Sequence, residues 1–77
     1  MMNNGSPSQE TVERLRREFP VGCEVELVRM DDVNAPPIGT LGVVTSVDSI
    51  GTIHVNWRSG STLGVAYRAD LCRRIDG

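Results

Sequence analysis

The stretch Thr52-Ile53-His54-Val55-Asn56-Trp57-Arg58-Ser59-Gly60-Ser61 decides the fold class of this 77-residue chain. Apolar and polar residues alternate from Ile53 to Trp57, which is the period-two pattern of a half-buried strand. The four residues that follow contain Gly60, and glycine supplies the positive φ that tight hairpin connections need. The stretch therefore predicts a strand over residues 52–57 that ends in a short hairpin turn.

Strand patterns continue on both sides of this stretch. Further short strands are predicted over residues 23–27, 39–47, 62–66 and 71–75. Turns or loops are predicted at residues 31–38, 48–51 and 67–70, the first because Pro36 and Pro37 remove backbone donors and fix φ. The chain from residue 23 to 75 is therefore expected to be a series of five short strands.

The segment before these strands has a different period, which predicts a helix over about residues 7–19. Ser6 is the expected N-cap and Pro7 the first helical residue. Val12, Leu15 and Phe19 form one apolar stripe, and Pro20 ends the helix. A helix of about 12 residues is marginal alone, so its stripe is expected to dock on the strands.

Five short strands joined by tight turns bury their apolar faces best by curling into a small barrel. The predicted interior consists of Val25, Leu27, Val44, Ile53, Val55, Trp57, Leu63, Val65 and Ile75, with Val12, Leu15 and Phe19 closing one end or side. Residues 1–5 are expected to be a loose tail and residues 6–77 a single domain.

Two sequence motifs carry a family resemblance. They are Gly39-Thr40-x-Gly42-x-Val44-x-x-Val47-Asp48 and Gly51-x-Ile53-His54-Val55-x-Trp57-x-x-Gly60-Ser61-x-Leu63. Over roughly residues 11–65 the chain resembles the domain of unknown function four-three-one-four. This resemblance implies a mainly β fold, a small SH3-like five-stranded barrel with one N-terminal helix, of the kind carried by bacteria, phages and mobile elements.

Composition excludes several classes of protein. Ten acidic residues against eight arginines give a net charge of −2, unlike the strongly basic surface of a dedicated nucleic-acid binder. With Phe19 and Trp57 assigned to the core, only Tyr67 is left for stacking on bases or prolines. Neither a membrane span nor a signal peptide is apparent, so a soluble cytoplasmic protein is expected.

No catalytic, cofactor-binding or metal-binding residue is predicted. The spacing of Cys23 and Cys72 indicates neither a zinc site nor a disulfide scaffold, and both are expected to be buried on strands. His54 has no acid or nucleophile beside it by strand spacing, so it is expected to lie on the surface. Asp31, Asp32 and Asp48 could bind a hard cation, but capping of loop backbone N–H groups is favoured.

The arginines have two possible roles, ion pairing or phosphate binding. Those of the helix are placed to pair with Glu10, Glu13 and Glu18. If the first and last strands are neighbours, Glu24 and Glu26 pair with Arg73 and Arg74. A weakly basic patch around Arg58 and Arg68 keeps nucleic-acid binding by the C-terminal half as the alternative function.

The favoured function is a non-enzymatic module that binds a protein partner through polar loops on a rigid scaffold. The candidate contact residues are Asp31, Asp32, Asn34, Pro36, Arg58, Ser59, Tyr67 and Arg68. Because the resemblance points to phages and mobile elements, one version is an inhibitor of a host defence complex, similar to an anti-CRISPR protein, that acts through acidic side chains. Both a monomer and a homodimer remain open.

Overall fold

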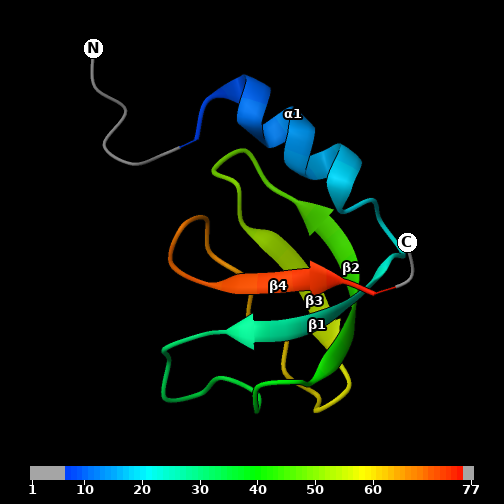
Figure 1. Cartoon of the computed structure of the whole chain (residues 1–77), viewed down its shortest axis with the longest axis vertical. Helices are drawn as coiled ribbons and strands as arrows, with labels where there is room; N and C mark the ends of the chain where they lie inside the picture. The colour runs from blue at the N-terminus through cyan, green and yellow to red at the C-terminus, as the bar shows by residue number, and fades with distance from the viewer. Residues whose placement is uncertain (1–6, 76–77) are drawn as a thin grey trace.

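Four of the five predicted strands assemble into one antiparallel sheet with a helix at its end (Figure 1). This computed structural model describes residues 7–75. Its elements are α1 (Gln9–Glu18), β1 (Glu24–Arg29), β2 (Leu41–Val47), β3 (Ile53–Trp57) and β4 (Leu71–Arg74). The strand order is β3-β2-β1-β4, so β1 lies between its sequence neighbour β2 and the last strand, β4. The mainly β fold with one helix is confirmed, but the sheet has four strands and is not closed into a barrel.

The strand expected over residues 62–66 is reduced to a single bridge between Val65 and Ile53. Within this segment, the backbone groups of Leu63 form hydrogen bonds with side chains instead of with a neighbouring strand. The indole Nε1 of Trp57 donates to the carbonyl oxygen of Leu63 at 2.8 Å, and the N–H of Leu63 donates to Ser61 Oγ at 3.2 Å. Because both groups of Leu63 bond to side chains, this residue cannot extend a ladder along β3.

The sheet is bent so that its apolar side chains face inward. Register shifts interrupt the β1–β4 pairing between Leu27 and Arg29 and the β2–β3 pairing between Val44 and Ser46. Such shifts bend a strand and increase its twist. Figure 1 shows the result, with β1 and β4 passing in front of β3.

Most of the predicted interior is buried. The buried apolar residues are Val12, Phe19, Cys23, Val25, Leu27, Val44, Val47, Ile53, Val55, Trp57, Val65 and Cys72. Leu15 packs against this core while partly buried, and Leu63 is also partly buried. Ile75 is wrongly assigned to the interior, since it is 36% exposed. Cys72 faces the core, and the alternation along a strand therefore turns Ile75 outward.

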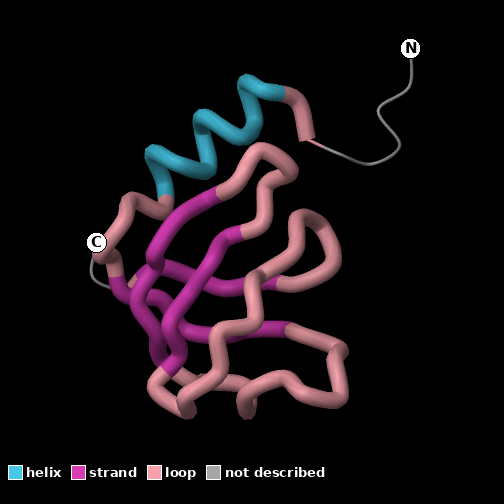
Figure 2. Tube along the Cα trace, turned by 180° about the vertical axis from the view of Figure 1, so that it is seen from behind, coloured by secondary structure: helices cyan, strands magenta, loops and turns pink. Residues whose placement is uncertain are grey.

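The helix begins later than predicted. Ser8 is the N-cap and its side chain accepts a hydrogen bond from the N–H of Thr11 at 3.1 Å, whereas the expected cap, Ser6, lies outside the described residues. The predicted tail over residues 1–5 lies outside them as well. Figure 2 shows α1 across one end of the sheet, where Arg16 Nε donates to the carbonyl oxygen of Val47 at 3.1 Å. Arg16 thus ties the helix to β2.

Candidate functional site

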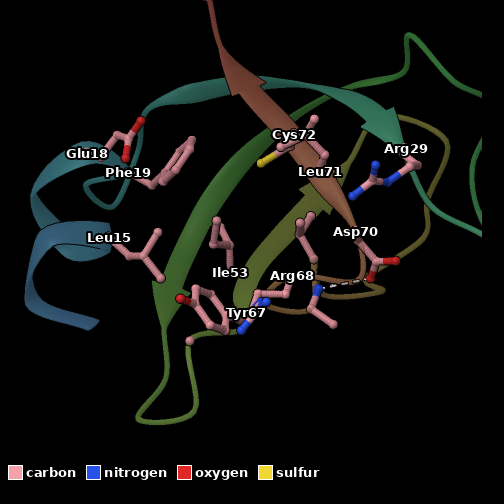
Figure 3. Close-up of a pocket in the computed structure, with 13 residues that line it drawn as sticks. Leu15, Glu18, Phe19, Arg29, Ile53, Tyr67, Arg68, Asp70, Leu71 and Cys72 are labelled. Carbon is pink, nitrogen blue, oxygen red and sulfur yellow. Dashed lines mark hydrogen bonds between the residues drawn. The ribbon is translucent and has the colours of Figure 1, made fainter. Parts of the chain in front are cut away.

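A groove of about 320 Å³ lies between the C-terminal half of α1, the turn over residues 66–70 and β4. Its inner lining is apolar and comes from Phe19, Ile53, Val65 and Cys72, all of which are buried. In Figure 3 Leu15 of α1 and Phe19, the C-cap of that helix, face Ile53 across this space. The groove therefore opens directly onto the core, at the place where the sheet fails to close.

The rim of the groove carries charges of both signs. Figure 3 shows Glu18 beside Phe19 at one end, and Arg29 near Asp70 at the other. The Arg68 side chain lies between these ends and is exposed. An apolar lining with a charged rim is the usual make-up of a site that binds a side chain of a partner.

The turn that carries Tyr67 and Arg68 is held at both ends by hydrogen bonds. Asp70 Oδ2 accepts from the N–H of Ala66 at 2.9 Å, and the N–H of Asp70 donates to the carbonyl oxygen of Ala66 at 3.0 Å. Arg68 has φ +68°, a left-handed conformation that a residue with a side chain rarely adopts. The turn thus holds Arg68 at the rim at some cost in backbone energy.

Cys72 forms part of the groove lining as a protonated thiol. Burial, together with the neighbouring Cys23 and Glu18, raises the pKa of Cys72 to about 12. Since the thiolate is the reactive form of cysteine, Cys72 is inert at neutral pH and serves as a small apolar group. The prediction that Cys23 and Cys72 are buried is confirmed.

His54 has an acidic partner that strand spacing did not reveal. Its Nε2 lies 2.8 Å from Asp48 Oδ2, and both side chains are partly exposed. Burial alone would raise the pKa of Asp48, but hydrogen bonds from His54 and from the N–H groups of Thr52 and Ile50 outweigh it and lower the pKa. The pair fixes the turn between β2 and β3, and it lies outside the groove lining.

The candidate residues of the long loop do not line the groove, although the loop begins two residues after Arg29 on its rim. Asp31, Asp32 and Asn34 are exposed, whereas Pro36 is buried and so is not part of the loop surface. Asp32 Oδ1 accepts from the N–H of Asn34 at 2.7 Å, the capping role that was favoured over cation binding. Figures 1 and 2 both place this loop at the end of the molecule opposite α1.

The hairpin tip with Arg58 and Ser59 lies beside the long loop, where the N–H of Arg58 donates to the carbonyl oxygen of Leu41 at 2.9 Å. Gly60 has φ +97°, as the hairpin prediction required. The tip and the long loop therefore share one end of the molecule, while Tyr67 and Arg68 line the groove. The structure separates the candidate residues into two surfaces.

Glu24 and Glu26 of β1 each form an ion pair with an arginine. Glu26 pairs with Arg73 at 2.6 Å, as predicted for neighbouring first and last strands. Glu24 pairs with Arg58 at 2.9 Å, a partner that was not predicted. Arg74 donates to the carbonyl oxygen of Glu18 at 3.3 Å and so joins β4 to the end of α1.

Within residues 7–75, no three His, Cys, Asp or Glu side chains are grouped so that they could hold a metal ion. In the same part of the chain, no helix combines the length and the apolar character that crossing a membrane requires.

Together these features define a small antiparallel β-sheet domain with a helix at one end and an apolar groove along its open side. The chain belongs to the family described as domain of unknown function DUF4314, whose profile matches residues 8–75. No curated protein and no solved structure matches the chain.

Proposed function

We propose that this protein is a non-enzymatic binding module whose groove receives an apolar side chain from an extended segment of a protein partner. The apolar lining beneath a charged rim carries this proposal. Burial of one Val, Leu or Phe side chain contributes about 1.5–3 kcal/mol, and contacts with the rim would add orientation and specificity.

Arg68 supports the proposal because its backbone conformation favours glycine. A left-handed residue with a side chain costs about 1–2 kcal/mol, yet the chain holds an arginine there, at the groove rim. Strained residues of this kind cluster at binding sites. We assign Arg68 the role of contacting an acidic or carbonyl group of the partner.

The order of the sheet supports a finer description of the fold as an open SH3-like domain. The bridge between Val65 and Ile53 adds a fifth segment to the sheet, next to the edge strand β3. The turn over residues 66–70 then leads from this segment to β4 at the opposite edge of the sheet. The fifth strand would then be present only as this bridge. An accessory role for a phage or mobile element fits a binding module of this size.

The ion pairs favour binding of a protein in the groove over two other functions, nucleic-acid binding and inhibition through acidic side chains. Arg58 and Arg73, which would contact phosphate, are engaged by Glu24 and Glu26. The same pairs partly neutralise Glu24 and Glu26, two of the acidic residues that an inhibitor of a nucleic-acid groove, similar to an anti-CRISPR protein, would use. The groove is therefore the surface that we propose for function.

Selection from a random peptide library on the immobilised protein tests this proposal. We expect enriched peptides to share an apolar residue and to shift the NMR signals of groove residues such as Leu15, Ala66 and Leu71. If no peptide is enriched, or if the shifts map to the opposite end of the molecule, the proposal is wrong.

Replacement of Arg68 by glycine separates binding from folding. Arg68→Gly removes the side chain and relieves the backbone, so stability should stay equal or rise by up to about 1 kcal/mol. Because a charged hydrogen bond is lost, the selected peptides should bind about tenfold or more weakly, as measured by isothermal titration calorimetry. Arg17→Ala, an exposed arginine outside the groove lining, is the control and should leave affinity unchanged.

A further inference from the structure

We infer that the groove of one copy is occupied by the loop over residues 31–38 of a second copy, which gives a reciprocal dimer. This inference rests on the proposed role of the groove as a binding site and names a partner for it. The loop, the groove rim and their places on the molecule each support it.

The loop presents two exposed apolar residues at the apices of two turns. Val33 is 97% exposed and Ile38 is 62% exposed. The N–H of Ala35 donates to the carbonyl oxygen of Asp32 at 3.0 Å, which closes the turn around Val33. The N–H of Thr40 donates to the carbonyl oxygen of Pro37 at 3.1 Å, which closes the turn around Ile38. The apex of each turn thus presents an apolar side chain to solvent, where the groove of a second copy could receive it.

The loop is anchored, so little conformational freedom would be lost when it binds. Pro36 is buried, and the end of the loop is hydrogen-bonded to β1. The N–H of Gly39 donates to the carbonyl oxygen of Leu27 at 2.8 Å, and the N–H of Leu27 donates to that of Thr40 at 2.9 Å. A preorganised loop lowers the entropic cost of association.

The charges of loop and groove are complementary. Asp31 and Asp32 are the only charged residues between Met30 and Thr40. The groove rim offers the exposed guanidinium groups of Arg29 and Arg68. Of the rim acids, Glu18 lies at the far end and Asp70 lies near Arg29, so Arg68 is the guanidinium group that we assign to the acids of the loop. The acidic start of the loop therefore matches the arginine side of the groove.

The positions of loop and groove favour a second copy as the source of the loop. No residue of 31–38 lines the groove of its own chain, and the loop extends toward the end opposite α1 (Figures 1 and 2). The loop and the turn over residues 66–70 project to the same side in both views. Two copies placed side by side in antiparallel orientation would bring each loop opposite the groove of the other, as twofold symmetry requires.

Sedimentation velocity over a wide range of protein concentration tests this dimer. The wild-type chain should change reversibly from monomer to dimer, and added salt should weaken the dimer because exposed charges contribute. Val33→Asp with Ile38→Asp, and separately Arg68→Glu, should each weaken dimerisation about tenfold or more. An equimolar mixture of the loop variant and the groove variant should recover part of the association, because one of the two contacts stays intact. Val21→Asp, an exposed valine that lines neither surface, should dimerise as the wild type does.

Three outcomes would overturn the inference: a monomer at every concentration, a dimer that the loop variant leaves intact, or a dimer that Arg68→Glu leaves intact. Because all these positions are exposed, the variants should keep the circular dichroism of the wild type. The proposed function is judged separately. A monomer that still binds library peptides in the groove refutes only the dimer, whereas a loop-dependent dimer that binds no peptide refutes only the heterologous partner.

Discussion

Asp48 accepts hydrogen bonds from Ile50, Thr52 and His54, and these bonds lower its pKa in the folded protein. The unfolded chain has the ordinary aspartate pKa of about 3.9. The stabilisation from the carboxylate is therefore complete above that value and is lost as the pH falls through the folded pKa. We expect Asp48→Asn to lower stability at neutral pH by about 1 kcal/mol, a value reduced because the site is partly exposed, and to flatten the acid dependence.

Urea unfolding at a series of pH values between neutral and strongly acidic measures this effect. Glu13→Gln is the matched control, because Glu13 is an exposed helix carboxylate outside the groove lining and the long loop. It should retain the acid dependence of the wild type. An Asp48→Asn variant with the same midpoints as the wild type at every pH would contradict the role assigned to this carboxylate.

Single side chains were the hardest level to predict. Alternation identifies neighbours on the same face of a strand, and it correctly placed His54 on the outer side. Its partner Asp48 lies in the turn, and the register shift between Val44 and Ser46 sets how that turn meets β3. Such a shift has no signature in the alternation of residue types, so this pair could not be predicted.

At the level of elements, Gly42 decides how closely β2 approaches β3. A Cβ at Gly42 would lie 2.5 Å from Val55 Cγ1 and 2.8 Å from Trp57 Cε3. We expect Gly42→Ala to cost about 1–3 kcal/mol through overpacking. The free energy of unfolding in guanidinium chloride measures this loss, and the near-ultraviolet circular dichroism of Trp57 should change as the ring is displaced.

Gly60→Ala is the comparison for this prediction. A Cβ at Gly60 meets no atom within 4 Å, but its φ of +97° disfavours any side chain. Its loss should be about 1 kcal/mol from the backbone alone, with an unchanged tryptophan signal. If both variants alter the tryptophan signal equally, close strand approach is not the reason for the glycine at position 42.

The elements themselves were largely predictable, and the errors have local causes. Strand alternation and glycine turns correctly indicate β1, β2, β3 and the two turns that follow β2 and β3. The strand over residues 62–66 failed because side chains of Ser61 and Trp57 take the backbone groups of Leu63. The N-cap was assigned to Ser6 in place of Ser8 because two serines stand two residues apart, and the sequence alone does not reveal the hydrogen bond from the N–H of Thr11 to Ser8.

At the scale of the whole molecule, Trp57 connects the sheet to residues 62–66, the segment that forms only one bridge with β3. It is buried, and its indole Nε1 donates to the carbonyl oxygen of Leu63. We expect Trp57→Ala to cost about 3–5 kcal/mol, which is enough to unfold a domain of this size. Trp57→Phe keeps most of the buried area and should lose only about 1 kcal/mol for the hydrogen bond.

Thermal melting followed by far-ultraviolet circular dichroism checks both variants. Trp57→Ala should show no cooperative transition, while Trp57→Phe should melt cooperatively at a somewhat lower temperature than the wild type. A cooperative melt of Trp57→Ala close to that of the wild type would remove Trp57 from the set of residues that hold the domain together.

The groove could not be predicted from the sequence, because many separate segments build it. Its lining joins α1, the end of β1, Gly51, β3, the turn over residues 66–70 and β4. Tyr67 and Arg68 were correctly singled out as turn residues, but neither their spacing nor their type indicates the apolar lining beneath them. That lining depends on where the bent sheet stops, which only the tertiary structure determines.

The pairing of β1 with β4 also has a consequence for biosynthesis. β1 takes its second neighbour from residues about 45 positions later, as the Val25–Arg74 and Leu27–Cys72 partners show. Contacts this distant in sequence form late, and a ribosome delivers the N-terminal end first. The nascent chain therefore holds an incomplete sheet until residue 75 has left the exit tunnel. Until then β1 exposes one edge to chaperones and to neighbouring chains.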